Sequence, residues 1–307
     1  MKDIWVEKYR PKKVDEYVFK NEAQKRQIKG WIDDGGIPHL LFTGSAGTGK
    51  TTLARVLINE LGVQDADLLF MNASRDNGID HVRRKITNFS ETMPWGDFKI
   101  VLLDEADYLS PDAQAALRGV MEQYHTSVRF ILTCNYGNKI IPALQSRCQI
   151  LQIQKQDPVE FTARLAEILI TENVKFELDL LDTFVRATYP DMRKTINNLQ
   201  AATINGILTE PAETDEDTTW RVKMVELFKA GQIKEARKMI VASARPDEYE
   251  DIYRWLYDNI EMFGNTEEKQ DEAILIIRNG LVKHLSVADV EINLSATLVE
   301  LQQNYHT

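Results

Sequence analysis

The chain has 307 residues, of which 43% are hydrophobic, and a formal net charge of −10. This length allows two or three domains, and the mixture of apolar and charged residues is that of an ordinary globular protein. The negative charge argues against a protein that coats nucleic acid over its whole surface, and no apolar run approaches the roughly 18 residues of a membrane span.

Five short apolar runs, each bounded by polar residues, predict buried strands in the first half of the chain. Helical patterns between them, such as residues 51–61 and 111–124, predict a parallel α/β sheet. The five runs lie at residues 39–43, 68–71, 99–103, 128–132 and 150–153.

The strands are expected to stop after Asp157-Pro158, and helical patterns over 159–208 break at Asn173, Tyr189-Pro190 and Asn205-Gly206. The acidic segment 209–217 contains a proline and is the best linker in the chain. Helical patterns return over 220–307. The sequence therefore predicts a sheet domain over 1–156, a helical domain over 157–210 and a second helical domain over 211–307.

Charge and cysteines limit the function further. Residues 213–307 hold 11 Lys and Arg against 19 Asp and Glu, so residues 1–212 carry a net charge of only −2 and leave room for a local basic strip. Cys134 and Cys148 are too few for a disulfide framework or an all-cysteine zinc site, so we expect reduced thiols in or near a core. The N-terminus lacks the apolar core of a secretory signal, so a cytoplasmic location is expected, in the host cytoplasm if the protein is viral.

A phosphate-binding pattern, G-x-x-x-x-G-K-[ST], follows the first predicted strand and precedes a helix. Glycines let the loop curl so that several N–H groups point at phosphate, and the following helix adds its positive end. We expect Lys50 to reach the β- and γ-phosphates of ATP and the Thr51 hydroxyl to bind Mg²⁺. The predicted nucleotide-binding residues are Gly44, Ser45, Ala46, Gly47, Thr48, Gly49, Lys50, Thr51 and Thr52.

Two carboxylates, Asp104 and Glu105, follow the strand predicted at 99–103. Ligands bind at this end of a parallel sheet, and two neighbouring carboxylates repel unless a cation lies between them. Asp104 is therefore predicted to hold Mg²⁺ and Glu105 to orient the attacking water. The alternative for Glu105 is a solvent-exposed acid at a strand end.

With these motifs in place, about residues 4–205 resemble the AAA+ clamp-loader family, the small subunits of replication factor C and phage clamp loaders. The resemblance implies an AAA+ P-loop NTPase domain, a helical lid and an all-helical collar, matching the three predicted domains. The segments that carry it are 5–11 (WVEKYRP), 72–74 (NAS), 78–83 (GIDHVR), 132–135 (LTCN), 146–148 (SRC) and 189–193 (YPDMR).

The resemblance assigns three polar residues to the nucleotide. Asn135 would hydrogen-bond the γ-phosphate or the lytic water, Arg147 would act on ATP bound by a neighbouring subunit, and Arg193 would contact the nucleotide from the lid. The alternatives are a turn-initiating asparagine, a surface arginine and an arginine near a helix N-terminus. The catalytic set is thus Lys50, Glu105, Asn135 and, in trans, Arg147.

The resemblance also places the base. Val6, Arg10, Tyr17 and Val18 would enclose the adenine, although a simple hydrophobic anchor is the alternative for them. Asn72 resembles a polar residue that, in this class, holds the catalytic glutamate away until a ligand binds.

Two surfaces are assigned to partners. Arg75, Arg83, Arg84 and Lys85 would contact the DNA backbone, the alternative being a solvated basic face. Arg118 stands where the family often has two basic residues, but Gly119 follows it, which weakens a DNA contact there and leaves a role at the subunit boundary. Phe89, Met93 and Trp95 would insert into the ring clamp, the alternative being packing against the sheet, which is favoured for Ile86.

We therefore expect an ATP- and Mg²⁺-dependent motor subunit that opens and loads a sliding clamp onto primer-template DNA, in a ring of five subunits, without a membrane partner. One alternative is another AAA+ DNA motor, such as a branch-migration helicase. Another is a non-hydrolysing scaffold subunit of a clamp loader, but such subunits lose the lysine, the catalytic acid or the arginine, and all are present here.

Overall fold

The computed structural model describes residues 4–75, 79–211, 216–284 and 286–306. Contacts divide the chain into two compact units, Met1–Ile168 with Pro190–Ile196 and Leu169–Tyr189 with Asn197–Thr307. The segment expected to form a separate lid is therefore shared between the two units. The three-domain division at 156/157 and 210/211 stays a prediction.

The first unit contains a five-stranded parallel sheet in the order β2-β3-β4-β1-β5. All five predicted strands are present. Because β1 lies between β4 and β5, the loop that follows β1 opens at a point where the strand order reverses, which is where ligands bind in open α/β sheets. The strands are β1 Leu40–Thr43, β2 Leu68–Asn72, β3 Lys99–Asp104, β4 Val128–Cys134 and β5 Gln149–Gln152.

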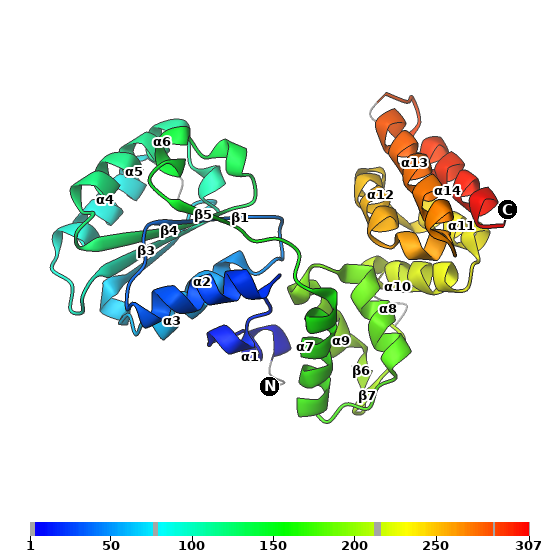
Figure 1. Cartoon of the computed structure of the whole chain (residues 1–307), viewed down its shortest axis with the longest axis horizontal. Coiled ribbons are helices and arrows are strands. Elements are labelled where there is room, and N and C mark those ends of the chain that lie inside the picture. The colour runs from blue at the N-terminus through cyan, green and yellow to red at the C-terminus, as the bar shows by residue number, and fades with distance from the viewer. Residues whose placement is uncertain (1–3, 76–78, 212–215, 285, 307) are drawn as a thin grey trace. The chain divides into compact units, whose positions relative to one another are not determined.

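Helices cover both faces of this sheet (Figure 1). Leu40 and Phe42 of β1 pack with α2 (Glu22–Asp33) and α3 (Lys50–Glu60), whereas Leu41 between them faces the opposite cluster. This alternation follows from the two-residue period of a strand. The opposite face is covered by α4 Ile79–Glu91, α5 Pro111–Gln123 and α6 Pro142–Gln145.

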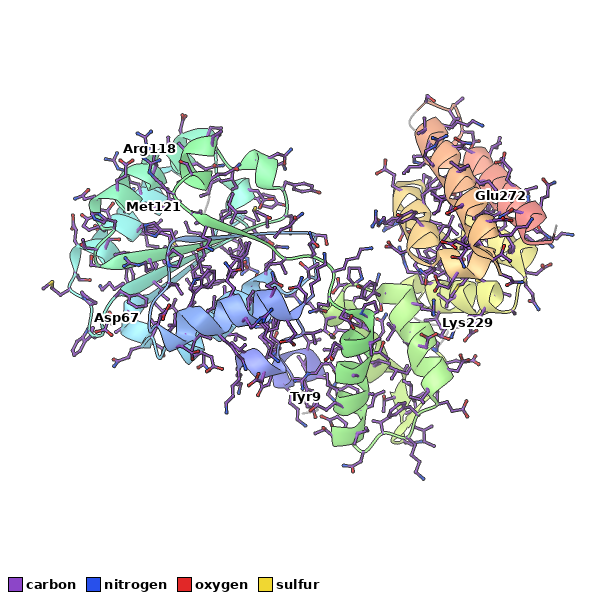
Figure 2. All side chains as sticks on the ribbon, in the orientation of Figure 1. Tyr9, Asp67, Arg118, Met121, Lys229 and Glu272 are labelled. Carbon is purple, nitrogen blue, oxygen red and sulfur yellow. The ribbon has the colours of Figure 1, made fainter. Side chains whose placement is uncertain are left out.

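Side-chain positions on α5 show how the helical period separates core from surface. Met121 is 1% exposed and packs in the core, whereas Arg118, three residues earlier, lies at the surface (Figure 2). The helix begins with Ser110, whose hydroxyl accepts a hydrogen bond from the Ala113 amide at 3.2 Å and caps the first turn.

Three helices follow the sheet. The first two end at Thr171 and Thr188, within two residues of the predicted breaks, and the third ends at Ala202, before the break predicted at Asn205-Gly206. The expectation that strands stop after Asp157-Pro158 is wrong, because a short antiparallel hairpin pairs residues 203–204 with 207–208. Asn205 and Gly206 have φ values of 51° and 75°, the two positive values that a tight hairpin turn requires. These elements are α7 Pro158–Thr171, α8 Leu178–Thr188, α9 Met192–Ala202, β6 Thr203–Ile204 and β7 Ile207–Leu208.

The rest of the second unit is helical, as predicted. Of the expected linker at 209–217, residues 212–215 lie outside the described residues, and helix begins again at Glu216. The helices are α10 Glu216–Lys229, α11 Ile233–Ser243, α12 Tyr249–Asp258, α13 Glu267–His284 and α14 Val290–His306. In the first unit, the chain also forms the short helix α1 Trp5–Lys8. Turns of 3₁₀ helix lie at Val14–Glu16, Asp65–Asp67, Ala106–Tyr108, Gly137–Lys139, Pro246–Glu248 and Ile260–Phe263.

Both cysteines are free thiols, as expected. Burial raises the pKa of Cys134 to about 11 and that of Cys148 to about 12, so neither thiol is reactive at neutral pH. Among the helices that the structure describes, none has the length and apolar character to cross a membrane.

Candidate nucleotide site

The loop between β1 and α3 has the backbone geometry of a phosphate cradle. Gly49, the last loop residue, has φ +90°, a conformation that L side chains rarely adopt. A Cβ at Gly44 would lie 2.1 Å from the carbonyl oxygen of Ile153, so only glycine fits there. Glycine at these two positions lets the loop turn back on itself and enter α3, whose N-terminal N–H groups suit an anion.

Lys50 is folded back over the loop. Its Nζ donates hydrogen bonds to the carbonyl oxygens of Gly44 at 2.9 Å and Ser45 at 2.7 Å, and to Oδ1 of Asn135 at 2.8 Å. Burial lowers the pKa of Lys50 from its ordinary value, although the carboxylates of Asp104 and Glu105 act in the opposite direction. The ammonium group is thus held between β1 and β4, next to the side-chain amide of Asn135, a residue that the sequence assigns to the nucleotide site.

Three side chains meet at the ends of α3, β3 and β4. Oδ1 of Asp104 accepts hydrogen bonds from the hydroxyls of Thr51 and Thr133, each at 2.6 Å. Hard oxygen ligands of this kind suit Mg²⁺, which usually takes one or two protein oxygens and fills its remaining positions with waters and substrate phosphates. The described residues include no group of three or more His, Cys, Asp or Glu that could hold a metal by themselves. Thr51 and Asp104 therefore fit a metal that is shared with a phosphate ligand.

Glu105 lies directly beyond this cluster in a strained backbone conformation. It has φ 57° and ψ 42°, the left-handed region that non-glycine residues rarely occupy. Its amide donates to the Thr133 hydroxyl oxygen at 3.1 Å, so Thr133 connects the two acidic residues. Strain of this sort is typical of functional sites.

The backbone after β4 is fixed by a second carboxylate. Oδ2 of Asp107 accepts hydrogen bonds from the amides of Asn135 at 3.3 Å and Tyr136 at 3.2 Å. Asn135 is therefore held by its backbone, while its side chain faces Lys50. The alternative, an asparagine that only initiates a turn, does not account for its contact with Lys50.

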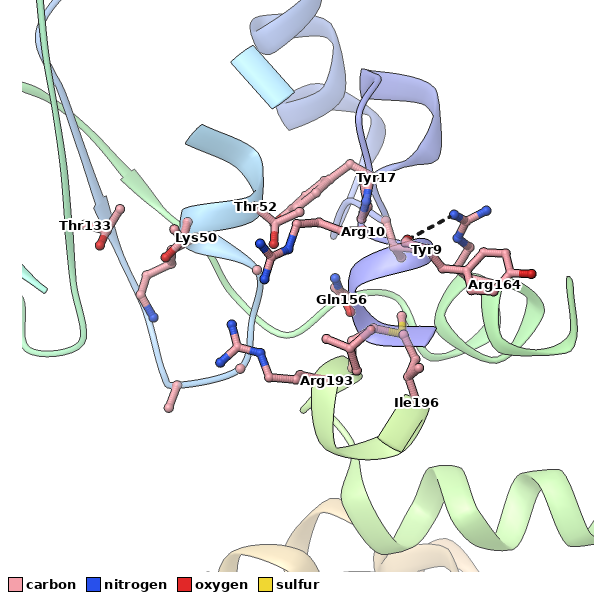
Figure 3. Close-up of a pocket in the computed structure, with 18 of the residues that line it drawn as sticks. Tyr9, Arg10, Tyr17, Lys50, Thr52, Thr133, Gln156, Arg164, Arg193 and Ile196 are labelled. Atoms are coloured by element: carbon pink, nitrogen blue, oxygen red, sulfur yellow. Dashed lines mark hydrogen bonds between the residues drawn. The ribbon is translucent and has the colours of Figure 1, made fainter. Parts of the chain in front are cut away.

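A cavity extends from the loop to the N-terminal segment and to α7 and α9, all within the first unit (Figure 3). Most of the predicted nucleotide-binding residues line it; Gly44, Ser45 and Thr48 do not, and instead shape the loop behind it. The predicted residues on its wall are Val6, Arg10, Tyr17, Val18, Ala46, Gly47, Gly49, Lys50, Thr51, Thr52, Asp104, Glu105, Asn135 and Arg193.

Sequence reasoning missed several residues on the same wall. Thr133 stands two residues before Asn135 in a segment already matched to the family, so its hydroxyl was a usable signal. Arg164 and Gln156 had none, because their places depend on how α7 returns to the N-terminal segment. The added lining residues are Tyr9, Pro11, Glu16, Thr133, Cys134, Gln156, Arg164, Ile168, Met192 and Ile196.

The cavity wall combines apolar side chains, such as Val6, Val18 and Ile196, with cationic ones. The buried ring of Tyr17 anchors the N-terminal segment through a hydrogen bond from its hydroxyl to the Thr48 carbonyl oxygen at 3.2 Å. Figure 3 shows the guanidinium groups of Arg10 and Arg193 extending from different segments toward the side of the cavity where Lys50 lies. This arrangement fits a ligand with a flat apolar part and a strongly anionic part.

Arg147 is not among the residues that line this cavity. It follows α6, where its Nη1 donates to the Ala143 carbonyl oxygen at 2.7 Å and its Nη2 pairs with Glu122. Asn72 lies opposite Asp104 in the register of β2 against β3, and its Oδ1 accepts hydrogen bonds from the Ser74 amide at 2.9 Å and the Ser74 hydroxyl at 2.5 Å.

The predicted DNA-contacting residues Arg83, Arg84 and Lys85 are exposed on α4, and Arg75 is exposed before it. Asp76 lies outside the described residues. Arg83 to Lys85 lie in the second turn of α4 rather than at its start, because the helix already begins at Ile79.

The residues predicted to contact a clamp differ in exposure. Phe89 packs partly buried against the sheet core, with Nζ of Lys99 lying 4.4 Å from its ring centre. Met93 and Trp95 are 86% and 80% exposed. The Trp95 amide donates to Oδ2 of Asp67 at 2.9 Å, so this apolar loop has an anchored backbone. Ile86 is buried, as its alternative interpretation expects.

Comparison with known proteins gives two kinds of match. Residues 40–155 match the model of the ATPase family associated with various cellular activities (AAA). A replication factor C small subunit of Archaeoglobus fulgidus is 42% identical over 252 residues, covering 78% of this chain and 77% of the relative. Small subunits of Methanocella arvoryzae and Sulfurisphaera tokodaii are 38% and 40% identical, covering 78% of this chain and 76% and 70% of their own lengths. The likeness therefore extends well beyond the AAA segment.

Proposed function

This chain belongs to the replication factor C small-subunit family, and from that premise we propose how it works as an ATPase subunit of a clamp loader in DNA replication. It binds ATP with Mg²⁺ in the cavity beside Lys50 and hydrolyses it. A ring of such subunits, five in the predicted assembly, uses the cycle of ATP binding and hydrolysis to place a sliding clamp on primer-template DNA.

The observation that carries the proposal is the meeting of Thr51, Asp104 and Thr133 beside Lys50. Two 2.6 Å hydrogen bonds on one carboxylate oxygen bring a metal-binding acid to the N-terminus of the loop helix. A site that only bound an anion would need the loop and the lysine, but no acid beside them. The acid supports a metal-assisted reaction at phosphate.

Each residue of the nucleotide site then has a physical role. The backbone of residues 44–49 and the ammonium group of Lys50 bind the phosphates, and Thr51 and Asp104 hold Mg²⁺, which when bound neutralises charge on the phosphate oxygens. Glu105 orients the attacking water and accepts its proton. Asn135 hydrogen-bonds the γ-phosphate or that water without adding charge, and Arg193 draws α9 toward the phosphates.

Arg147 serves the neighbouring subunit. Its place outside the cavity of its own chain supports this role, since a guanidinium can offset the charge that develops in the transition state of phosphoryl transfer only where it reaches the phosphate. The presence of Lys50, Glu105, Asn135 and Arg147 together argues against a non-hydrolysing scaffold subunit. The relatives do not favour a branch-migration motor.

Two surfaces meet the other partners. Arg75, Arg83, Arg84 and Lys85 contact phosphates of the DNA duplex, and their exposure supports that role. Met93 and Trp95 insert into the clamp from an anchored loop. Phe89 supports the base of that loop more than it contacts a partner, because it packs on the core. The cytoplasmic location stays a prediction.

A test measures ATP hydrolysis by the assembled loader with and without clamp and primed DNA. We expect clamp and DNA together to stimulate the rate. Glu105→Gln should still bind ATP but hydrolyse it about 10²-fold more slowly or worse, because an amide orients water poorly and cannot accept its proton. Equal rates for Glu105→Gln and the unmodified loader would contradict the assignment of Glu105, and a rate indifferent to the clamp would contradict the clamp-loader role.

A further inference from the structure

A carboxylate outside the nucleotide cavity holds Arg147. Nη2 of Arg147 forms an ion pair with Oε1 of Glu122, while Nη1 donates to the Ala143 carbonyl oxygen at 2.7 Å. Nε of Arg118 lies 4.0 Å from the same Glu122 oxygen. None of these three charged residues lines the cavity. Arg118, Glu122 and Arg147 together are called the Arg147 cluster below.

The backbone beneath the Arg147 cluster is firmly held. Met121, which precedes Glu122 on α5, is 1% exposed, and Leu144 of α6 is also 1% exposed in the same core. Cys148, which follows Arg147, packs against that core as well. The charged side chains nevertheless remain accessible, with 34% of the Arg147 side chain and 47% of the Glu122 side chain exposed. Rearrangement in this cluster therefore needs only side-chain rotation.

We propose that Glu122 is a positioning residue that holds Arg147 back until a neighbouring subunit presents bound ATP; this inference rests on the proposed role of Arg147 in trans. A guanidinium binds phosphate best through two parallel N–H groups. Both terminal nitrogens of Arg147 are engaged within its own chain. Arg147 must therefore release Glu122, the Ala143 carbonyl or both before it can bind a γ-phosphate in this way.

The energetics favour such an exchange. An ion pair between exposed side chains contributes little, whereas a bidentate bond between arginine and phosphate is among the strong charge-assisted hydrogen bonds. A triphosphate brought close by the neighbour therefore displaces Glu122. Arg118 lies one helical turn before Glu122 and is already 4.0 Å from its Oε1, so the carboxylate keeps a cation when Arg147 leaves.

The consequence is a restraint on hydrolysis in a ring whose subunits are loosely packed. Without clamp and DNA, Glu122 competes with the neighbour's phosphate for Arg147. Once the subunits close together, Arg147 binds the phosphate in place of Glu122, and Glu122 no longer affects the rate of hydrolysis. The carboxylate thus sharpens the difference between the resting and the stimulated rate.

The test substitutes Glu122→Gln in the assembled loader and measures ATP hydrolysis with and without clamp and primed DNA. Glutamine keeps the length and one carbonyl oxygen but removes the charge. We expect the rate without clamp and DNA to rise about two- to fivefold, as the loss of a weak surface pair allows, and the fold stimulation to fall by the same factor. Glu122→Asp, which keeps the charge on a shorter chain, should lie between.

Glu235→Gln is the matched control, because it removes one carboxylate of another exposed pair, 3.8 Å from Lys238. It should leave both rates unchanged. Arg147→Ala distinguishes a failure of the role of Arg147 in trans from a failure of the holding role of Glu122. If Arg147→Ala hydrolyses ATP at the unmodified rate, the role of Arg147 in trans fails. If Arg147→Ala is inactive and Glu122→Gln shows an unchanged or lower resting rate, only the holding role of Glu122 is overturned.

Discussion

Thr133 connects the two acidic residues on which the proposed chemistry depends. Its hydroxyl donates to Oδ1 of Asp104 at 2.6 Å and accepts from the amide of Glu105 at 3.1 Å. One side chain thus fixes both the orientation of the metal-binding carboxylate and the strained backbone at Glu105. A residue with this double contact acts on the reaction through its neighbours.

We expect Thr133→Val to raise the Mg²⁺ concentration needed for half-maximal ATP hydrolysis and to lower the maximal rate about tenfold. Valine matches the shape of threonine but leaves the Glu105 amide without its acceptor and Asp104 with one donor fewer. Displaced catalytic groups commonly cost this much or more. Thr133→Ser, which keeps the hydroxyl, is the control; the same Mg²⁺ dependence in both variants would show that Thr133 has no such role.

At this scale the sequence predicts the residues that are close together along the chain. The loop at 44–52 and the pair Asp104-Glu105 could be predicted, because each is a local motif with a fixed spacing along the chain. Gln156 and Arg164 could not be assigned, because their positions depend on the path of the chain from β5 through α7. The exposure of Phe89 likewise depends on packing that one sequence does not display.

Among the elements, α4 (Ile79–Glu91) has a side chain in the core and a run of basic side chains at the surface. Ile86 faces the sheet core at 1% exposure, whereas the three preceding basic side chains are exposed. A cationic helix face of this kind suits the phosphate backbone of DNA, and phosphate contacts carry no sequence information.

We expect Arg83→Ala, Arg84→Ala and Lys85→Ala each to weaken binding of primed DNA by the loader to a similar degree for different sequences. Each lost phosphate contact should reduce the slope of log affinity against log salt by about one, because one fewer counterion is released. Lys238→Ala, on exposed α11 surface, serves as the control. Slopes unchanged in all three variants would show that these residues form a solvated basic face and do not contact DNA phosphates.

The elements themselves follow from sequence to different extents. The five strands and the helices between them could be predicted because apolar runs and helical periods are local properties. The hairpin at 203–208 could not, since strands of two residues have almost no pattern and only Asn205-Gly206 indicated it. Helix α10 begins at Glu216, four residues before the helical pattern predicted from residue 220.

At the scale of the whole molecule, the proposed mechanism requires more than one chain. Lys50, Asp104, Glu105 and Arg193 line the cavity, whereas Arg147 lies outside it and pairs with Glu122. If Arg147 acts in trans as proposed, the nucleotide site of each subunit is completed only by its neighbour. Hydrolysis then reports contact between neighbours, which is what a ring that responds to clamp and DNA needs.

The measurement that tests this claim most directly mixes two defective proteins. Lys50→Ala should lose ATP binding, because it removes the ammonium group beside the loop, but it keeps Arg147. Arg147→Ala should bind ATP nearly as well as the unmodified chain, because its own cavity is intact. A competent site forms only where an Arg147→Ala pocket meets a Lys50→Ala neighbour.

Both variants are to be assembled separately and together, with the presence of both in one ring verified by native mass. Each alone should hydrolyse ATP very slowly, since a trans arginine contributes about 10³-fold or more in phosphoryl transfer. The account predicts that mixed rings hydrolyse ATP clearly faster than the sum of the two separate rates. Mixed rings no faster than that sum would contradict it, and Arg147 would then be structural or act within its own chain.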